Sequence, residues 1–523
     1  MLGITTPVAP TQAQMEAQRR GAVTNTNQAQ QQSAPLAPFY ELPSDLSWIL
    51  ANFLRLRDRV ALKISNKGTY DDIDTTINKL ITSDIRTINK EALKYIFKFG
   101  TGAQLTHVFD KGIQELISLD LSCTASDREN IASVILHIAM SDEGITALIA
   151  NPNVITRLTT LAKQANTELG REYIVAAIFK ISNRPAGRTA LIANGVITTL
   201  NHLANQDNTE EGRSNIAAAI FKISTRPAGI TALIANGAIT TLNHLANQGN
   251  TEVSIVAAIF KISTSDEGRT ALIANGAITT LNYLAAQDNS EYVQEWIAAA
   301  IRNIAMSNEG IAALIANGAI TTLNNLANQD NTEEGRSNIA AAIFNISTRP
   351  SGITALIAND AITTLNHLAA QDNSKYVQEC IAAAIRNIAM SNEGIAALIE
   401  NDAITTLNNL AAQDNTEYGR ECIAATIYDI STSLAGDTAL IANGAITTLN
   451  NLAAQKNTEY GLQYIVTAIR HIAMSDEGRT ALIANGALTT LNHLANQDNT
   501  EVGREYIEEA KTLLKSNRYC TIS

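Results

Sequence analysis

Apolar residues recur at helical spacing along most of the chain, and Gly, Asn and Asp interrupt them at regular intervals. In the segment 318–359 the pattern predicts three helices, with the sequences AITTLNNLA, EEGRSNIAAAIFNIS and GITALIA. Asp330, Asn331 and Thr332 are candidate N-caps for the long helix, whose first turn is acidic. The short helix should end at Asn-Gly or Asn-Asp, because these residues tolerate a left-handed turn.

The same three-helix pattern recurs with a period of 42 residues and one interval of 39. Such self-similarity is typical of a solenoid, in which each unit buries its apolar face by stacking on the next, at roughly 10 Å per repeat. A less regular copy runs from about Lys111 to Pro152, and the segment 276–359 closely matches 360–443 as a double unit. The turn between consecutive units is predicted at Asn153, Gly195, Gly237, Gly276, Gly318, Asp360, Asp402, Gly444 and Gly486.

Composition supports a repeat fold and narrows the partners. Of the 523 residues, 46% are apolar, mostly Ala, Ile and Leu, and only 5% are aromatic, so the core must consist of many small repeated contacts. The net charge of −12 argues against broad binding of a phosphate backbone, because nucleic-acid affinity depends on a positive surface. The sequence therefore predicts no nucleic-acid partner.

Several absences bear on the compartment. Four cysteines in so long a chain do not make a disulfide framework, and the N-terminus does not read as a secretory signal peptide. No run of about 18 apolar residues predicts a membrane-spanning helix. Residues 1–38 are rich in Gln, Ala, Thr, Asn and Pro and are expected to be disordered. The sequence predicts a reducing, cytoplasmic environment.

The order of a short helix, a Gly-Ala-Ile helix and a longer helix ending like Ala-Ile-Arg-Asn-Ile-Ala resembles the armadillo repeat over about 400 residues. The resemblance implies an all-α, right-handed superhelical solenoid over 111–510. Proteins of this kind bind extended peptides through an Asn on the third helix and a Trp one turn earlier. Ala299, Ala341 and Ala383 stand at the Trp position, which argues against an importin-like carrier of nuclear-localisation peptides.

The Asn position changes in character along the repeats. It begins with His137 and then holds Lys180, Lys222, Lys261, Asn303, Asn345, Asn387, Asp429 and His471, which are the predicted groove residues. Three consecutive lysines at one end would select a partner that is acidic there. The alternative is a set of solvated polar residues on a helix face. The aromatic residues before the lysines, such as Phe179, are expected to pack between repeats.

Ahead of the repeats, residues 39–72 carry the sequence FYELPSDLSWILANFLRLRDRVALKISNKGTYDD, which resembles an F-box. Gly68 stands near the position where an aromatic residue usually closes that motif. The resemblance implies docking to a Skp-type adaptor and, through it, to a cullin ubiquitin ligase. The alternative is an N-terminal cap for the solenoid, linked to it by helices in 73–110. The adaptor would contact the amphipathic face made by Leu42, Pro43, Leu46, Ile49, Leu50, Phe53 and Leu54.

The tail 511–523 ends in Cys520-Thr521-Ile522-Ser523, which matches a C-a-a-X box for farnesylation of Cys520. Lys511, Lys515 and Arg518 would each add about 1 kcal/mol of attraction to an anionic leaflet. A single lipid chain binds membranes marginally, so the expected attachment to the cytosolic face is reversible. The alternative is a cysteine of no function in a frayed tail.

Other candidates for chemistry do not converge. His202, His244, His367 and His493 share one repeat position, one or more repeats apart, so they are expected to be surface residues and not metal ligands. Cys380 and Cys422 are also equivalent positions, too far apart for a disulfide. Glu295, Glu379 and Glu421 recur by repetition. No phosphate loop or nucleophile motif is present, so neither catalysis nor a cofactor or metal is expected.

Together the three segments indicate a non-catalytic substrate receptor: 39–72 recruits the ligase adaptor, the solenoid selects an unidentified protein target, and Cys520 places the assembly at a membrane. The combination resembles F-box effectors that intracellular bacteria deliver into host cells, and a eukaryotic prenylated F-box protein would have the same parts. The alternative is a membrane-tethered armadillo scaffold with no role in ubiquitin transfer.

Overall fold

The computed structural model describes Ile113 and residues 124–249, 252–497 and 501–516, and over these residues it contains helices and no strands. The segments 1–38, 39–72 and 73–110 and Cys520 lie outside the described residues, so the expectations for disorder, for the adaptor-binding face and for prenylation stay predictions. Among the described helices, no single one is long and apolar enough to cross a membrane, and α7 with α8 reaches that length only as a pair bent by 115°.

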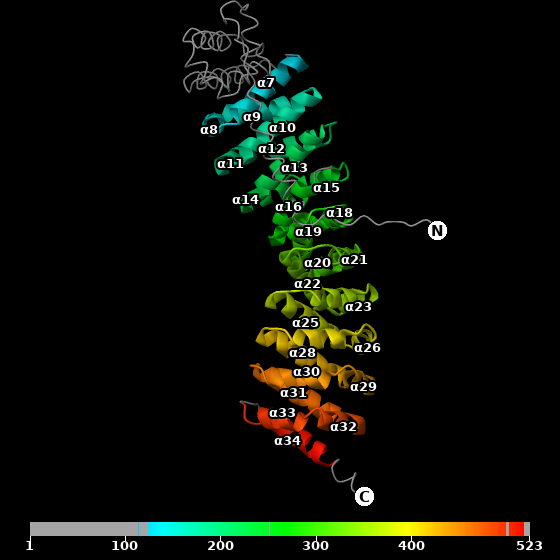
Figure 1. The fold of residues 1–523 in the computed structure, drawn as a ribbon. Helices are drawn as coiled ribbons and strands as arrows, with labels where there is room; N and C mark the ends of the chain where they lie inside the picture. Colours follow the sequence, from blue (N-terminus) through cyan, green and yellow to red (C-terminus); the bar gives the residue numbers. More distant parts are fainter. Residues whose placement is uncertain (1–112, 114–123, 250–251, 498–500, 517–523) are drawn as a thin grey trace, which may run out of the picture. The chain divides into compact units, whose positions relative to one another are not determined.

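Over the described residues, α7 (Ala125–Ile138) is followed by nine three-helix units (Figure 1). The first helices are α8 (Asp142–Ala150), α11 (Pro185–Ala193), α14 (Pro227–Ala235), α17 (Asp266–Ala274), α20 (Asn308–Ala316), α23 (Pro350–Ala358), α26 (Asn392–Glu400), α29 (Leu434–Ala442) and α32 (Asp476–Ala484). The second helices are α9 (Pro152–Ala162), α12 (Val196–Ala204), α15 (Ala238–Ala246), α18 (Ala277–Ala285), α21 (Ala319–Ala327), α24 (Ala361–Ala369), α27 (Ala403–Ala411), α30 (Ala445–Ala453) and α33 (Ala487–Leu494). The third helices, with α7 as the equivalent that precedes them, are α10 (Glu168–Ser182), α13 (Glu210–Ser224), α16 (Glu252–Ser263), α19 (Glu291–Ile304), α22 (Glu333–Ser347), α25 (Lys375–Ala389), α28 (Glu417–Ile430), α31 (Glu459–Ile472) and α34 (Glu501–Ser516).

The unit predicted from 318–359 is confirmed, with one shifted boundary. Helices α21 and α22 have the predicted ends, and Thr332 is the N-cap of α22, accepting a 2.9 Å hydrogen bond from the backbone N–H of Gly335. The short helix α23 begins at Pro350, two residues earlier than predicted. Proline suits a first helical position because its φ is fixed near the helical value and its missing N–H has no partner there.

Left-handed turns separate the first and second helices of the units. These are the predicted turns, which were counted as lying between units because the predicted unit began at its Ala-Ile helix. Gly318 has φ = 70°, and Asp360 and Asp402 take the same conformation at 60° and 57°. The prediction is wrong at Asn153, because α9 starts at Pro152 and Asn153 lies inside the helix. A proline at that helix start replaces the left-handed Gly or Asp of the other units.

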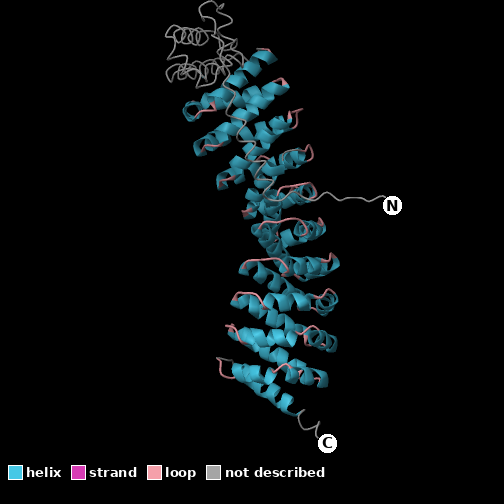
Figure 2. Ribbon diagram, in the orientation of Figure 1, coloured by secondary structure: helices cyan, strands magenta, loops and turns pink. Residues whose placement is uncertain are grey.

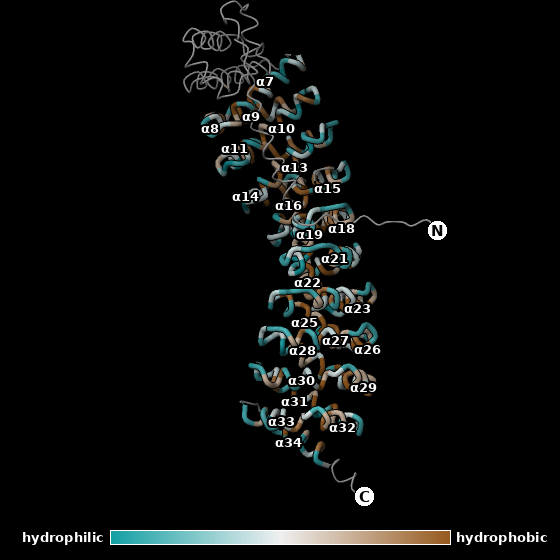
Figure 3. Tube along the Cα trace, viewed as in Figure 1, coloured by the Kyte–Doolittle hydropathy of each residue, from teal (hydrophilic) through white to brown (hydrophobic). Residues whose placement is uncertain are grey.

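Consecutive third helices pack directly on one another and form the centre of the stack (Figure 1). In α22 the side chains of Ile339, Ile343 and Ile346 are fully buried, and Ala340 and Ala342 between them let neighbouring helices approach closely. Short loops join the helices (Figure 2), and hydrophobic residues gather between them along the stack (Figure 3). The core is therefore a continuous series of small aliphatic contacts, as the composition predicts.

An asparagine in seven of the nine second helices, α12 to α30, ties one unit to the next. In α21, Asn324 donates a 2.6 Å hydrogen bond to the backbone oxygen of Asn359, and its own side-chain oxygen accepts a 2.8 Å bond from Thr364 in α24. The pattern gives seven successive interfaces the same pair of polar contacts. It recurs at Asn201, Asn243, Asn282, Asn366, Asn408 and Asn450.

Candidate functional site

The predicted groove residues occupy one position near the C-terminal end of eight successive third helices. All eight are half-buried: Lys180 in α10, Lys222 in α13, Lys261 in α16, Asn303 in α19, Asn345 in α22, Asn387 in α25, Asp429 in α28 and His471 in α31. Because these helices pack side by side, the eight residues form one row. The row and the residue that precedes each of its members are here called the third-helix face. His137 does not share this environment, because it is buried in α7 with its Nδ1 2.7 Å from the backbone oxygen of Ser133.

The lysine end of the face pairs each ammonium group with an aromatic ring. The Nζ atoms of Lys180, Lys222 and Lys261 lie 5.7, 5.5 and 4.9 Å from the ring centres of the phenylalanines that precede them. These rings are half-buried, so they pack between repeats and also support the lysines. Three positive charges on three adjacent helices make this end of the face basic.

The asparagines in the middle of the face are partly used inside the stack. The amide nitrogens of Asn303 and Asn387 donate 3.0 Å hydrogen bonds to the hydroxyls of Ser263 and Ser347 in the preceding third helices. Each of these amides keeps its oxygen as an acceptor and one N–H as a donor for a partner.

The far end of the face is a packed cluster of aromatic and charged groups. Burial raises the pKa of Asp429 to about 6, although Arg386 acts in the opposite direction. Burial and then the charge of Arg470 lower the pKa of His471, whose ring meets Tyr428 edge-on at 5.3 Å between ring centres. The guanidinium of Arg386 lies 5.6 Å from the ring centre of Tyr464. This end is less basic than the lysine end and presents aromatic surface.

A cavity of about 190 Å³ opens in the face among α19, α22, α25 and α28. Arg302, Phe344, Asn345, Tyr376 and Tyr418 are among the residues that line it, with the small side chains of Ala341 and Ala383. Both alanines occupy the position at which the family resemblance expects Trp, and their short side chains leave the space open. Its volume is close to that of one large side chain. The adjoining thiol of Cys380 is buried, which raises its pKa to about 11 and keeps it protonated at neutral pH.

Sequence reasoning missed the exposed apolar residues near this face. Tyr292, Tyr376, Tyr418 and Tyr460 lie in the first turns of third helices and are all exposed, and Met306, Met390 and Met474 follow such helices with 64%, 75% and 53% exposure. The 42-residue recurrence of Tyr376, Tyr418 and Tyr460 was the available signal. Exposed aromatic and methionine side chains are characteristic of binding surfaces.

Other predicted residues have structural or surface positions. His202, His244, His367 and His493 are exposed, as predicted, and each hydrogen-bonds a glutamine four residues later. Cys380 and Cys422 are both free and buried. Repetition alone does not account for Glu295, Glu379 and Glu421, because each accepts a hydrogen bond from the threonine that caps the next third helix, at 2.7, 2.5 and 2.7 Å.

Comparison with known proteins supports the fold. No family model matches the chain, and no curated protein matches it. An engineered protein from a structural genomics consortium superposes with a TM-score of 0.56 at 21% identity, covering 77% of this chain and 99% of its own. A structure from a study of the phosphorylation switch that controls the interaction between cadherin and beta-catenin superposes with a TM-score of 0.50 at 12% identity, covering 84% and 100%.

A designed armadillo repeat protein is 29% identical over 45% of this chain and 99% of its own, with a TM-score of 0.39. The two longer superpositions, together with the repeated three-helix units, settle the architecture. The chain has the all-α fold of an armadillo-type repeat solenoid.

Proposed function

We propose that the chain is a substrate-recruiting subunit of a cullin-type ubiquitin ligase. In this proposal residues 39–72 bind a Skp-type adaptor, the third-helix face holds an extended segment of the target protein, and a prenyl group on Cys520 places the assembly at the cytosolic face of a membrane. The cell is either the one that makes the protein or a host into which it is delivered. Catalysis would belong to the associated ligase.

The observation that carries the binding role is the third-helix face itself. Eight adjacent helices each contribute a half-buried polar or charged residue at one position, and the cavity between Arg302 and Tyr418 provides room for a side chain in the middle of the row. A long row of this kind suits an extended segment, because each repeat advances by roughly 10 Å, about three residues of extended chain.

The charge of the face favours a particular partner. Lys180, Lys222 and Lys261 offer three ammonium groups on neighbouring helices. None of them forms an ion pair with a carboxylate among the described residues. A target segment with an acidic side chain at about every third residue would place one carboxylate near each lysine. The chain's excess of negative charge elsewhere would disfavour other orientations.

Fluorescence anisotropy with a labelled peptide (Glu-Gly-Ser)₄ tests this role. The triple variant K180A/K222A/K261A is expected to lose binding, and K163A/R349A/K456A, which removes three exposed cations outside the row, is expected to keep it. Equal affinities for the two variants would reject the lysine row as a binding site. A peptide of the same composition with its glutamates adjacent should bind more weakly, since it matches the repeat spacing less well.

A pull-down with the Skp-type adaptor tests the ligase role. Substitution of Leu42 and Pro43 by alanine should abolish capture while circular dichroism shows an unchanged helical signal. If the unaltered chain fails to bind the adaptor, 39–72 becomes a cap of the array, and a membrane-tethered scaffold is the better account.

The membrane role has its own assay. The full chain incubated with protein farnesyltransferase and farnesyl diphosphate should gain one farnesyl group by mass spectrometry, and Cys520→Ser should gain none. The modified chain should then co-sediment with anionic vesicles. An unmodified Cys520 would remove membrane attachment from the proposal and leave the adaptor and target roles intact.

A further inference from the structure

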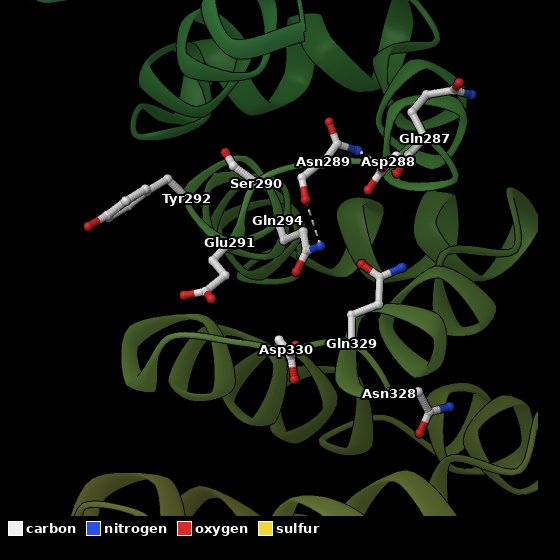
Figure 4. Close-up of a pocket in the computed structure, with 10 residues that line it drawn as sticks. All are labelled: Gln287, Asp288, Asn289, Ser290, Glu291, Tyr292, Gln294, Asn328, Gln329 and Asp330. Atoms are coloured by element: carbon white, nitrogen blue, oxygen red, sulfur yellow. Dashed lines mark hydrogen bonds between the residues drawn. The ribbon is translucent and has the colours of Figure 1, made fainter. Parts of the chain in front are cut away.

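A second candidate site lies at the other end of the third helices, away from the lysine row. The loop between α18 and α19 and the loop between α21 and α22 border an open polar pocket of about 850 Å³. Asp288 and Glu291 line it from the first loop and helix, and Asp330 lines it from the second (Figure 4). All three carboxylates are exposed, and no lysine or arginine among the described residues forms an ion pair with any of them.

The duplicated segment contains its own version of this pocket with different charges. Eighty-four residues after Glu291 the chain has Lys375, and eighty-four after Asp330 it has Asp414. There the Nζ of Lys375 forms a 2.7 Å ion pair with Asp414. One repeat further the signs are reversed, and Glu417 pairs with Lys456 at 2.6 Å. The pocket at Glu291 has two negative charges at these positions, as does the unit of Glu333 and Asp372. It therefore lacks the cation that Lys375 and Lys456 supply in the two later units.

A buried amide also distinguishes the two copies. Gln294 is only 7% exposed; its amide nitrogen donates to the backbone oxygen of Asn289 at 3.2 Å, and its side-chain oxygen has no hydrogen-bond partner. The equivalent Gln378 additionally donates a 2.5 Å bond to the side-chain oxygen of Gln413 in the next loop. No such bond joins Gln294 to Gln329, and Figure 4 shows the two amides facing the space between the loops. The next loop therefore bonds the amide nitrogen of Gln378 but not that of Gln294, while the side-chain oxygen of each is buried without a partner.

We propose that this pocket binds a lysine or arginine side chain of a basic segment on a partner protein. The ligand's cation would take the place that Lys375 fills in the second copy, with Glu291 and Asp330 as its counter-charges. Rearrangement of the Gln294 amide would add an uncharged acceptor. Among the described residues no group of three or more His, Cys, Asp or Glu side chains is arranged to hold a metal ion, so the separated carboxylates suit a larger organic cation better.

The test uses the full chain and a fluorescein-labelled hexa-arginine peptide in a fluorescence anisotropy titration at low salt. Glu291→Lys copies the residue found at this position in the second unit, so it should fold normally and fill the pocket with its own cation. Glu400→Lys is the matched control: it makes the same charge change at an exposed helix end outside the pocket. Glu291→Lys should weaken binding by roughly fivefold or more, and Glu400→Lys should leave it within about twofold.

Equal weakening by the two substitutions would mean that the peptide senses only net charge, which would overturn the proposal. Spermine competition separates two sources of the same chemistry. Displacement of the peptide only at much higher spermine concentration supports a basic protein segment. Tighter binding of spermine than of the peptide, with the same loss in Glu291→Lys, would instead assign the pocket to a free polyamine.

Discussion

The hydroxyl of Thr332 lies 2.7 Å from a carboxylate oxygen of Glu295, although the two residues belong to different repeats. The same hydroxyl oxygen accepts the backbone N–H of Gly335 and so caps α22. One side chain therefore starts a helix and fixes it to the preceding third helix. The arrangement recurs at Thr167, Thr209, Thr416 and Thr458, each of which bonds a glutamate one repeat earlier. It gives the stack a polar seam along the N-terminal ends of its third helices.

Thr332→Ala should destabilise the array locally by about 1 kcal/mol, the usual cost of removing an N-cap. Hydrogen exchange measured by mass spectrometry should show faster exchange at the start of α22. The matched control is Ser290→Ala, because Ser290 is the N-cap of α19 and makes no side-chain capping bond. Equal acceleration in both variants would show that the Thr332 contacts contribute nothing.

Asn324→Ala should cost about 1–3 kcal/mol, because it leaves the hydroxyl of Thr364, only 4% exposed, without its acceptor. The midpoint of guanidinium unfolding, followed by circular dichroism, should fall. Asn325→Ala changes the exposed neighbour on the same helix and should leave the midpoint almost unchanged. A shift of the same size in the two variants would contradict the role assigned to the inter-repeat bonds.

Asp437 should make stability depend on pH. It is 9% exposed in α29, one of its side-chain oxygens is buried without a partner, and burial raises its pKa to about 6. A carboxyl with a raised folded-state pKa stabilises the fold below its unfolded value of 3.8, and that contribution is lost as the pH rises through 6. Equivalent units carry Ile353 and Ile395 at this position.

Asp437→Ile should therefore be more stable than the unaltered chain at pH 7.5, by up to roughly 2–3 kcal/mol, with a smaller difference at pH 4.5. Thermal melts at the two pH values measure it, and a difference that does not change with pH would contradict the assignment.

Gly352→Ala should destabilise the packing of the first turn of α23 against the end of α22. A Cβ atom at Gly352 would lie 1.8 Å from the backbone oxygen of Ile346, which is far inside van der Waals contact, so the backbone must move. The expected loss is about 1–3 kcal/mol, typical of overpacking. Ser351→Ala at the exposed preceding position is the control, and it should leave the thermal midpoint unchanged. A wild-type midpoint for Gly352→Ala would mean that α23 shifts away from Ile346 without cost.

Most of the fold was predictable because the signals are local and repeated. Helix ends at Thr332 and turns at Gly318 depend on residues within one turn of the chain. The prediction at Asn153 was wrong because the second helix of that unit, α9, starts with a proline where the other units have Gly or Asp. The bonds from Asn324 to Asn359 span 35 residues, and no periodicity within a helix indicates such a partner.

The candidate site was predictable in position but less so in character. The row from Lys180 to His471 was predicted from the repeat together with the armadillo resemblance, and its residues lie on adjacent helices. The cavity beside Arg302 depends on side chains from four helices, and the bond that occupies the amide of Asn303 comes from the preceding repeat. Burial and inter-repeat contacts of this kind follow only from the stacking geometry.

The near-identity of 276–359 and 360–443 has a genetic consequence. Loss of either double unit in frame would bring Asn275 next to Asp360, or Asn359 next to Gly444, and each junction keeps an asparagine before a residue suited to the left-handed turn. The inter-repeat bonds would re-form with equivalent residues, since Thr280 and Thr364 hold the same position. Unequal recombination between the two coding segments can thus lengthen or shorten the array by about 20 Å while the fold is kept. The length of the third-helix face can then change by inheritance while the kinds of residue on it stay the same.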